Sequence, residues 1–593
     1  MSATGLSRPA FWLAFYHAAV TAKTNPALVT QDAVRRLPRL ALLLFCAAYV
    51  LPGLFGRDPW RGADLNAFGQ MLALAEGRAP WLAPALGGVP TADALLPHWI
   101  GALAIMAGRG WIDPALAARL PFALLLVLTL VAVWYACFQL ARSEAAQPLP
   151  LAFGGEASPV DYARAIADGA LLLAIATLGL LQLGHETTPE LAQLAAVACL
   201  QWALAAAPRR TAAARIGVLL ALPALSACGA PAMSLALGIG ACWLSWRSRD
   251  NGLRSLTPWL AAASVAAALL AWPAGSWAWR VATDFDVTST AKLLLWFLWP
   301  AWPLLLWTLW RWRHHLAQRH LAIPLLVLSV ALLSCIAMDG SERALMLALP
   351  GLAVLAAFAL PTLQRGSTAA IDWFSVFFFS ACAVTIWIFY AAMQTGSPER
   401  AMATVLRLAP GFQSVWSGSA LALALLASAA WLGLVRWRTG RHREVIWKSL
   451  VLPAGGVALC WLLLMTLWLP LLDYGRSNRP LVERLLPLLG TPSAAHCIAA
   501  PQANRSLVAA LEFHGRWRVD ARPDADQGAC QLLLQASALR GPGVDAGIAL
   551  AAARGAAGWQ ELGRARRPTD RNEELVLYRR GIAAALNPAA PSR

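Results

Sequence analysis

Residues 120–140 read LPFALLLVLTLVAVWYACFQL, an apolar run without a charged side chain. A helix that crosses a bilayer needs roughly 17–25 mostly apolar residues, so this run is long enough to span a membrane. The same character extends over the chain, because 59% of its 593 residues are apolar and only 13% are charged. Soluble domains carry about 25% charged residues. The composition therefore predicts a polytopic membrane protein, excludes a disordered chain and disfavours an ordinary soluble enzyme.

Outward from this run, similar apolar segments bring the total to about thirteen candidate spans. The others are residues 40–56, 165–183, 190–207, 216–229, 230–246, 258–272, 292–310, 321–338, 343–360, 373–393, 418–435 and 446–471. No internal repeat is visible among them, which argues against a transporter built from two related halves.

The orientation follows from the net charge of +17, which gathers in short basic clusters at 209–210, 247–254, 311–319 and 436–443. Clusters between apolar runs obey the positive-inside rule, so they give no reason to expect a nucleic-acid partner. If the short apolar segment 95–108 crossed the membrane, all four clusters would lie outside. We therefore expect it to lie in the interface or to re-enter, which places the N-terminus in the cytoplasm and the C-terminal tail outside.

The predicted fold is an α-helical polytopic membrane protein with about thirteen transmembrane helices and a small C-terminal α/β domain. We expect a cytoplasmic segment (1–39), a membrane domain (40–472) whose first outer loop (57–116) carries surface helices, and an outer domain (473–593). In that domain the pattern predicts strands at 497–500, 530–534 and 573–578 and a helix at 504–514. Cys497 and Cys530 form either a disulfide or two buried thiols.

The first candidate site residue is Asp64, in the first outer loop. Leu65, Phe68, Leu72 and Ala75 follow it at helical spacing, which predicts a short helix over 64–76 along the membrane surface. Asp64 follows a Gly-Ala turn, so the alternative is that it only caps this helix.

The second candidate is Glu186, in the segment GHETTPE between two apolar runs. Thr188 before Pro189 is typical of a helix start, which places His185, Glu186 and Glu190 at the edge of the membrane. Ionisable groups there are costly and are functional candidates by default. The alternative is a glutamate that only stabilises a helix N-terminus.

The third candidate is Arg343, in the segment DGSERALMLALP. Its planar guanidinium matches the oxygens of a phosphate, and its predicted place is the outer membrane interface. The alternatives are a local pair with Glu342 or Asp339, or a side chain that snorkels to water.

With these positions the chain resembles the membrane glycosyltransferases of the C superfamily, particularly those similar to lipid A aminoarabinose transferase and the protein O-mannosyltransferases. Asp64 in ADLNAFGQM matches the Asp of the family's Asp-Glu pair, Glu186 matches its second acidic turn, and Arg343 matches a basic residue before a Leu-Pro. The resemblance covers about residues 40–472 and implies a bacterial inner-membrane enzyme that takes its sugar from a polyprenyl-phosphate donor.

The resemblance also implies roles. Asp64 is expected to take the proton of the acceptor hydroxyl and Arg343 to hold the donor phosphate. His185 and Glu186 are expected to orient the acceptor or to hold a divalent cation, with Glu190 and Asp93 in support. The acceptor, whether lipid A, a protein or a surface polysaccharide, is left open, and so is the need for a metal.

Three positions depart from the family pattern. Leu65 replaces the Glu of the Asp-Glu pair, 92–94 read Ala-Asp-Ala in place of Glu-Lys-Pro, and Leu347 replaces a tyrosine. These departures keep a second hypothesis open, that of an inactive relative which serves as an assembly partner. A lipid or solute transporter is a third, and the scarcity of charges within the spans argues against it.

Overall fold

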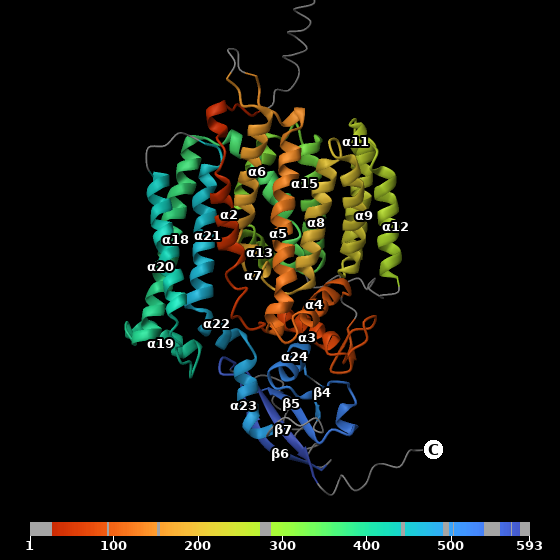
Figure 1. Cartoon of the computed structure of the whole chain (residues 1–593), viewed down its shortest axis with the longest axis vertical. Coiled ribbons are helices and arrows are strands. Elements are labelled where there is room, and N and C mark those ends of the chain that lie inside the picture. Colours follow the sequence, from red (N-terminus) through yellow and green to blue (C-terminus); the bar gives the residue numbers. More distant parts are fainter. Residues whose placement is uncertain are drawn as a thin grey trace, which may run out of the picture.

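The computed structural model consists of a bundle of helices and a small sheet domain at one end of it (Figure 1). It describes residues 26–91, 94–150, 155–272, 286–439, 445–489, 497–501, 503–538, 558–570 and 572–581. The bundle helices are α2 (Arg39–Val50), α5 (Pro114–Ala141), α6 (Pro159–Ala176), α7 (Leu178–Leu183), α8 (Pro189–Ala206), α9 (Thr211–Ala227), α10 (Pro231–Arg247), α11 (Asn251–Arg254), α12 (Thr257–Ala271), α13 (Val287–Phe297), α14 (Ala301–Arg311), α15 (Arg319–Ala337), α16 (Glu342–Met346), α17 (Leu349–Ala357), α18 (Arg365–Thr395), α20 (Gly418–Thr439) and α21 (Lys448–Leu467). The amphipathic helix α19 (Glu399–Leu408) joins α18 to α20.

The membrane character of the bundle is confirmed, whereas the number of spans is not. Within the described residues, six helices are long and apolar enough to cross a membrane, or seven if α13 and α14 form one span. The predicted span 292–310 is bent by 92° between these two helices, where Pro300 cannot donate a backbone hydrogen bond. The predicted span 343–360 is likewise divided into α16 and α17. Apolar composition alone did not reveal these breaks.

Two short helices lie at the end of the bundle that carries the sheet domain (Figure 1). The predicted surface helix is present as α3 (Ala63–Ala75), and most of its side chains are buried. The segment 95–108 forms α4 (Leu96–Ala107), which lies at this end of the bundle and packs on α3 and on the long helix α5. We call this end of the bundle the domain face.

The sheet domain has five strands in the order β4-β3-β5-β7-β6. They are β3 (Cys497–Ala499), β4 (Arg518–Asp520), β5 (Leu532–Ala538), β6 (Trp559–Ala565) and β7 (Glu573–Arg580), accompanied by α22 (Leu469–Arg476), α23 (Arg479–Leu489) and α24 (Arg505–His514). β3 pairs in parallel with β4 and β5, and β7 pairs antiparallel with β5 and β6. The predicted α/β character is thus confirmed, although β4 and β6 were not predicted. Cys497 and Cys530 form a disulfide, which resolves the two alternatives.

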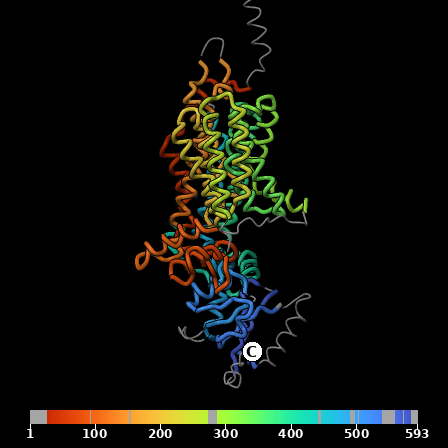
Figure 2. The backbone as a smooth tube through the Cα atoms, turned by 90° about the vertical axis from the view of Figure 1, so that its right-hand side faces the viewer, coloured from red at the N-terminus to blue at the C-terminus, as the bar shows by residue number. Residues whose placement is uncertain are grey.

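The sheet domain is docked on the first outer loop through α3 and α24. A Cβ atom added at Gly69 of α3 would lie 2.5 Å from the Cβ of Ala509 in α24, so only glycine permits this approach. The rings of Phe68 and Phe513 meet edge to face beside it, with 4.8 Å between centroids. The tube in Figure 2 shows the same order of bundle, loop and sheet domain from the side. The loop therefore forms the layer between the bundle and the sheet domain.

The orientation in the membrane can be tested because α11 and the sheet domain lie at opposite ends of the bundle (Figure 1). The positive-inside rule places the basic cluster around α11 in the cytoplasm. We expect a periplasm-active phosphatase fused after Arg580 to be active and the same reporter fused after Arg254 to be silent. The reverse pattern would show that the domain face is cytoplasmic.

Candidate active site

The carboxylate of Asp64 joins the start of α3 to the turn between α7 and α8. Its Oδ2 accepts hydrogen bonds from Arg57 Nη2 and the Trp60 backbone N–H, both at 3.1 Å. Its Oδ1 accepts from the backbone N–H and the hydroxyl of Thr187, both at 2.8 Å. The N-cap residue of α3 is Gly62, so the interpretation of Asp64 as a helix cap is wrong.

The charge of Asp64 is held by two arginines in a buried setting. The side chains of Arg57 and Asp64 are 0% and 2% exposed. Burial alone would raise the pKa of Asp64, but the charges of Arg57 and Arg119 and the hydrogen bonds of Thr187 outweigh it, and its pKa lies below its ordinary value. Asp64 is therefore an ionised carboxylate with four donors, which suits the fixing of a loop better than the uptake of a proton.

The second candidate, Glu186, forms an ion pair with Arg343 in α16. Arg343 Nη2 donates to Glu186 Oε2 at 2.6 Å, and Gln182 Nε2 donates to Oε1 at 2.9 Å. Arg343 Nη1 donates to the hydroxyl of Thr188 at 3.2 Å and lies 3.6 Å from Glu190 Oε2. Arg343 is thus directed to the acidic turn and not to a local acid of its own segment. As predicted, Thr188 is the N-cap residue of α8, with a proline in the first turn.

The surroundings shift the pKa values of Asp64 and Glu186 in opposite directions. Burial raises the pKa of Glu186 above its ordinary value, and the negative charge of Asp64 raises it further, against the opposing effect of Arg343. In active sites, a pair of acids whose pKa values are pushed apart commonly divides the acid and base roles. Here Glu186 is the acid that binds a proton more readily.

His185 faces away from the two acids. Its Nδ1 lies 2.7 Å from the carbonyl oxygen of Leu181 and its Nε2 lies 2.8 Å from that of Tyr49. Burial lowers its pKa to about 4, so the ring is neutral at physiological pH. A neutral ring has one N–H and donates to only one of these two carbonyl oxygens. The two contacts place the ring of His185 against the backbone of α2 and α7.

Among the described residues, the possible metal site has no matching group of side chains. In the described ranges, no group of three histidine, cysteine or acidic side chains is arranged to hold an ion. Asp93, the remaining candidate, lies outside the described residues. The other five candidates lie together around the turn 184–188, and they are Asp64, His185, Glu186, Glu190 and Arg343.

Three residues of this site were not predicted. Arg57 precedes Asp64 by seven positions in a loop, where no helical or strand period relates the two side chains. Gln182 and Thr187 flank Glu186 in the chain, yet neither has a charge that would mark it. The one available signal was the first arginine of GRDPWRG, which lies in the same loop as the candidate acid.

The comparisons with known proteins give structural likeness alone. No protein-family model and no curated protein sequence matches the chain. Two solved structures resemble it over nearly their whole length. The chain has the fold of ArnT. ArnT from Cupriavidus metallidurans bound to undecaprenyl phosphate gives a TM-score of 0.58 at 14% identity and covers 93% of this chain and 98% of that one. ArnT in the apo state gives 0.56 at 16% identity, with 99% and 100% covered.

This likeness in fold to ArnT agrees with the resemblance that the sequence indicated. Two of the three positions that depart from the family pattern are apolar and buried here, Leu65 at 0% and Leu347 at 3% exposure. In the third, at 92–94, the first two residues lie outside the described residues. A carboxylate in place of Leu65 would be enclosed and would need a partner of its own. The site around α3 therefore has one acid, Asp64, where the family pattern has two.

The ion pair of Asp64 leads to a prediction on stability. Replacing Asp64 by Asn leaves Arg57 buried without its counter-charge, a change that costs about 3–5 kcal/mol. The folded-state pKa of Asp64 is lowered. Its contribution is therefore complete above the unfolded value of about 3.9 and is lost as the pH falls through the folded value. The difference in Tm between wild type and Asp64→Asn, measured in detergent, should be large at pH 7 and shrink below about pH 4.

Asp524→Asn is the control for this prediction, because Asp524 is an exposed carboxylate of the sheet domain. Its Tm should follow that of the wild type throughout. Equal Tm values for Asp64→Asn and Asp524→Asn at pH 7 would contradict a stabilising role for the ion pair.

Proposed function

We propose that the chain is a membrane glycosyltransferase that moves a sugar from a polyprenyl-phosphate donor to an acceptor hydroxyl at the domain face. The observation that carries this proposal is the meeting of Asp64, Glu186 and Arg343 at that face. The fold supports it, because one of the ArnT structures that share this fold holds undecaprenyl phosphate.

Glu186 is the better base of the two acids. A general base works best when its pKa lies near the operating pH, and the pKa of Glu186 is raised whereas that of Asp64 is lowered. The partner of Glu186 is also more accessible, since the side chain of Arg343 is 22% exposed and that of Arg57 is 0% exposed. This assignment exchanges the roles that the family resemblance implies and makes Asp64 a positioning residue.

In the proposed reaction the acceptor oxygen attacks the anomeric carbon of the donor sugar and its proton passes to Glu186. A new carbon–oxygen bond forms on one face of the carbon while the bond to the phosphate oxygen breaks on the other, so the configuration inverts. The bonding electrons leave with the polyprenyl phosphate. Arg343 stabilises the charge that develops on the leaving phosphate.

The same arginine couples donor binding to proton uptake. Arg343 is paired with Glu186 at 2.6 Å and with Glu190 at 3.6 Å. A phosphate that approaches Arg343 competes for the same guanidinium nitrogens. Glu186 then loses part of its counter-charge, and its pKa rises further. The base therefore becomes a stronger proton acceptor when the donor is in place.

The expected cell compartment is the periplasmic side of a bacterial inner membrane, with an acceptor from the cell envelope such as lipid A, a protein or a polysaccharide. The disulfide between Cys497 and Cys530 supports an oxidising compartment for the sheet domain. The buried Leu65 and Leu347 favour the second candidate, an inactive relative that binds lipid and acts as an assembly partner.

Donor binding is tested at Arg343. Removing one charge-assisted contact costs about 1.5–3 kcal/mol, so Arg343→Ala should bind radiolabelled undecaprenyl phosphate about 10- to 150-fold more weakly than wild type. Arg343→Lys should recover only part of the loss, because an ammonium lacks the bidentate fork. Arg254→Ala, in α11 at the far end of the bundle, is the control and should bind as wild type does. Equal affinity in the two alanine variants would remove Arg343 from the donor site.

Transfer is tested by comparing the two acids. Glu186→Gln cannot take a proton and should lower turnover by about 10²–10⁴-fold while the lipid still binds. Asp64→Asn should lower turnover less after correction for the fraction of folded protein. The opposite ranking would return the base role to Asp64. Wild-type protein that binds the lipid but transfers no sugar from membrane-derived donors would favour the inactive relative.

A further inference from the structure

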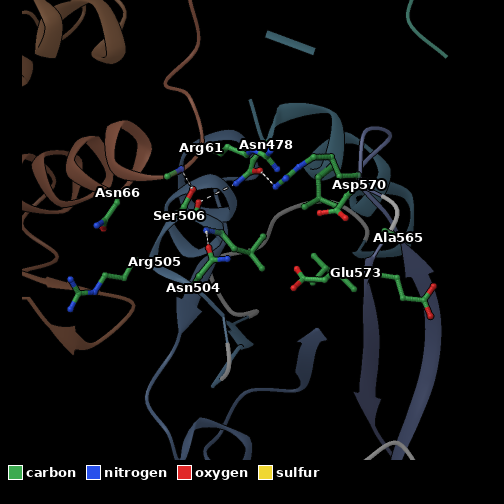
Figure 3. A pocket seen from close by; sticks show the side chains of 15 residues that line it. Arg61, Asn66, Asn478, Asn504, Arg505, Ser506, Ala565, Asp570 and Glu573 are labelled. Atoms are coloured by element: carbon green, nitrogen blue, oxygen red, sulfur yellow. Dashed lines mark hydrogen bonds between the residues drawn. The ribbon is translucent and has the colours of Figure 1, made fainter. Parts of the chain in front are cut away.

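A cavity of about 590 Å³ lies between the start of α3, the helices α23 and α24, and the strands β6 and β7 (Figure 3). None of the proposed catalytic side chains lines it. Its size falls within the range of about 300–1,000 Å³ that small-molecule sites occupy.

The lining of the cavity combines an apolar part with a polar one. Buried side chains of Leu481, Leu507 and Leu575 contribute the apolar part. In Figure 3 Asn504 faces Glu573 across the space, with Asp570 above. Hydroxyl groups suit such a polar wall, because carboxylates only accept hydrogen bonds and an amide both donates and accepts.

Two of the three arginines that line the cavity are not directed at the space between Asn504 and Glu573. Arg567 donates a hydrogen bond to the side chain of Asn478, and Arg505 points away from the space between Asn504 and Glu573 (Figure 3). A phosphate placed there would meet two carboxylates at close range, which is unfavourable. The lining instead matches a ligand with an apolar face and an edge of hydroxyl groups, which is the character of a sugar ring.

The cavity is connected to the candidate active site by a short polar chain. Gln182 bridges Glu186 and Arg476, with its Nε2 2.9 Å from Glu186 Oε1 and its Oε1 2.5 Å from Arg476 Nη1. The carbonyl oxygen of Arg476 accepts from the backbone N–H of Arg61 at 2.8 Å, and Arg61 lines the cavity. A molecule in the cavity would thus lie beside the loop that carries Asp64.

We propose that this cavity is a saccharide-binding subsite. Its role as the place where the sugar part of the acceptor is held rests on the proposed function, whereas the binding of a saccharide does not. The two can be separated, because saccharide binding needs no donor lipid.

The test uses full-length protein in a detergent without a sugar headgroup, since glycosidic detergents would compete. Saturation-transfer NMR and calorimetry measure the binding of chitobiose, lactose, maltose and inorganic phosphate at millimolar concentration. We expect at least one disaccharide to bind and Glu573→Trp, which fills the cavity, to abolish that binding. Glu573→Gln removes one charge-assisted acceptor and should weaken binding by about tenfold or more. Asp524→Asn, an exposed site outside the lining, should bind as wild type does.

Several outcomes would overturn the proposal. Wild-type protein that binds none of the disaccharides, or binds phosphate instead, has no saccharide subsite here. Equal disaccharide binding by wild type, Glu573→Trp and Glu573→Gln, all with unchanged Tm, would place the sugar elsewhere. If transfer is observed and Glu573→Trp leaves the acceptor KM unchanged, the cavity is not the acceptor subsite, although the proposed function stands.

Discussion

The buried carboxylate of Asp64 accepts four hydrogen bonds and thereby joins two parts of the chain that are distant in the sequence. Asp64 receives two hydrogen bonds from its own loop and two from Thr187, which is 123 positions away in the sequence. In surroundings of low dielectric such contacts are strong, and losing any one donor leaves charge uncompensated. The position of Glu186, the next residue before Thr187, is therefore fixed by the same contacts.

This arrangement also produces the electrostatic asymmetry of the site. The positive charges of Arg57 and Arg119 lower the pKa of Asp64. Burial and the negative charge of Asp64 raise the pKa of Glu186, and the charge of Arg343 opposes this rise only in part. One acid is thereby kept ionised and the other is made easier to protonate. Two carboxylates on neighbouring elements differ in this way because the arginines are unequally distributed between them.

The elements that follow from local patterns were predictable from the sequence. The helical spacing after Asp64 predicted α3, the Thr-Pro pair predicted the start of α8, and short apolar runs predicted β5 and β7. The breaks between α13 and α14 and between α16 and α17 were missed, because the spans were placed by apolar composition, which is the same in an interrupted run and a continuous one. β4 reads Arg-Val-Asp, with one apolar residue, and β6 is rich in polar residues, so neither has a strand-like pattern.

The candidate site shows the same limit of local reasoning. The sequence identified the acids and Arg343, since ionisable residues at span ends stand out against an apolar background. As the alternative to a phosphate-binding role it offered Arg343 a pair with Glu342 or Asp339, whereas the fold directs it to Glu186, 157 positions earlier. Long-range pairs of this kind depend on how the helices pack, and no spacing rule within one segment encodes that packing.

The contact of Gly69 with Ala509 has a consequence for how such proteins are inherited and recombined. The sheet domain follows the membrane part in the chain, which suggests a module that could be exchanged at a single junction near residue 473. The domain packs, however, on the helix α3 near the other end of the sequence, where one additional methyl group at Gly69 would collide with α24. A hybrid of two relatives would therefore need two crossovers, so that the first loop and the C-terminal domain come from the same parent.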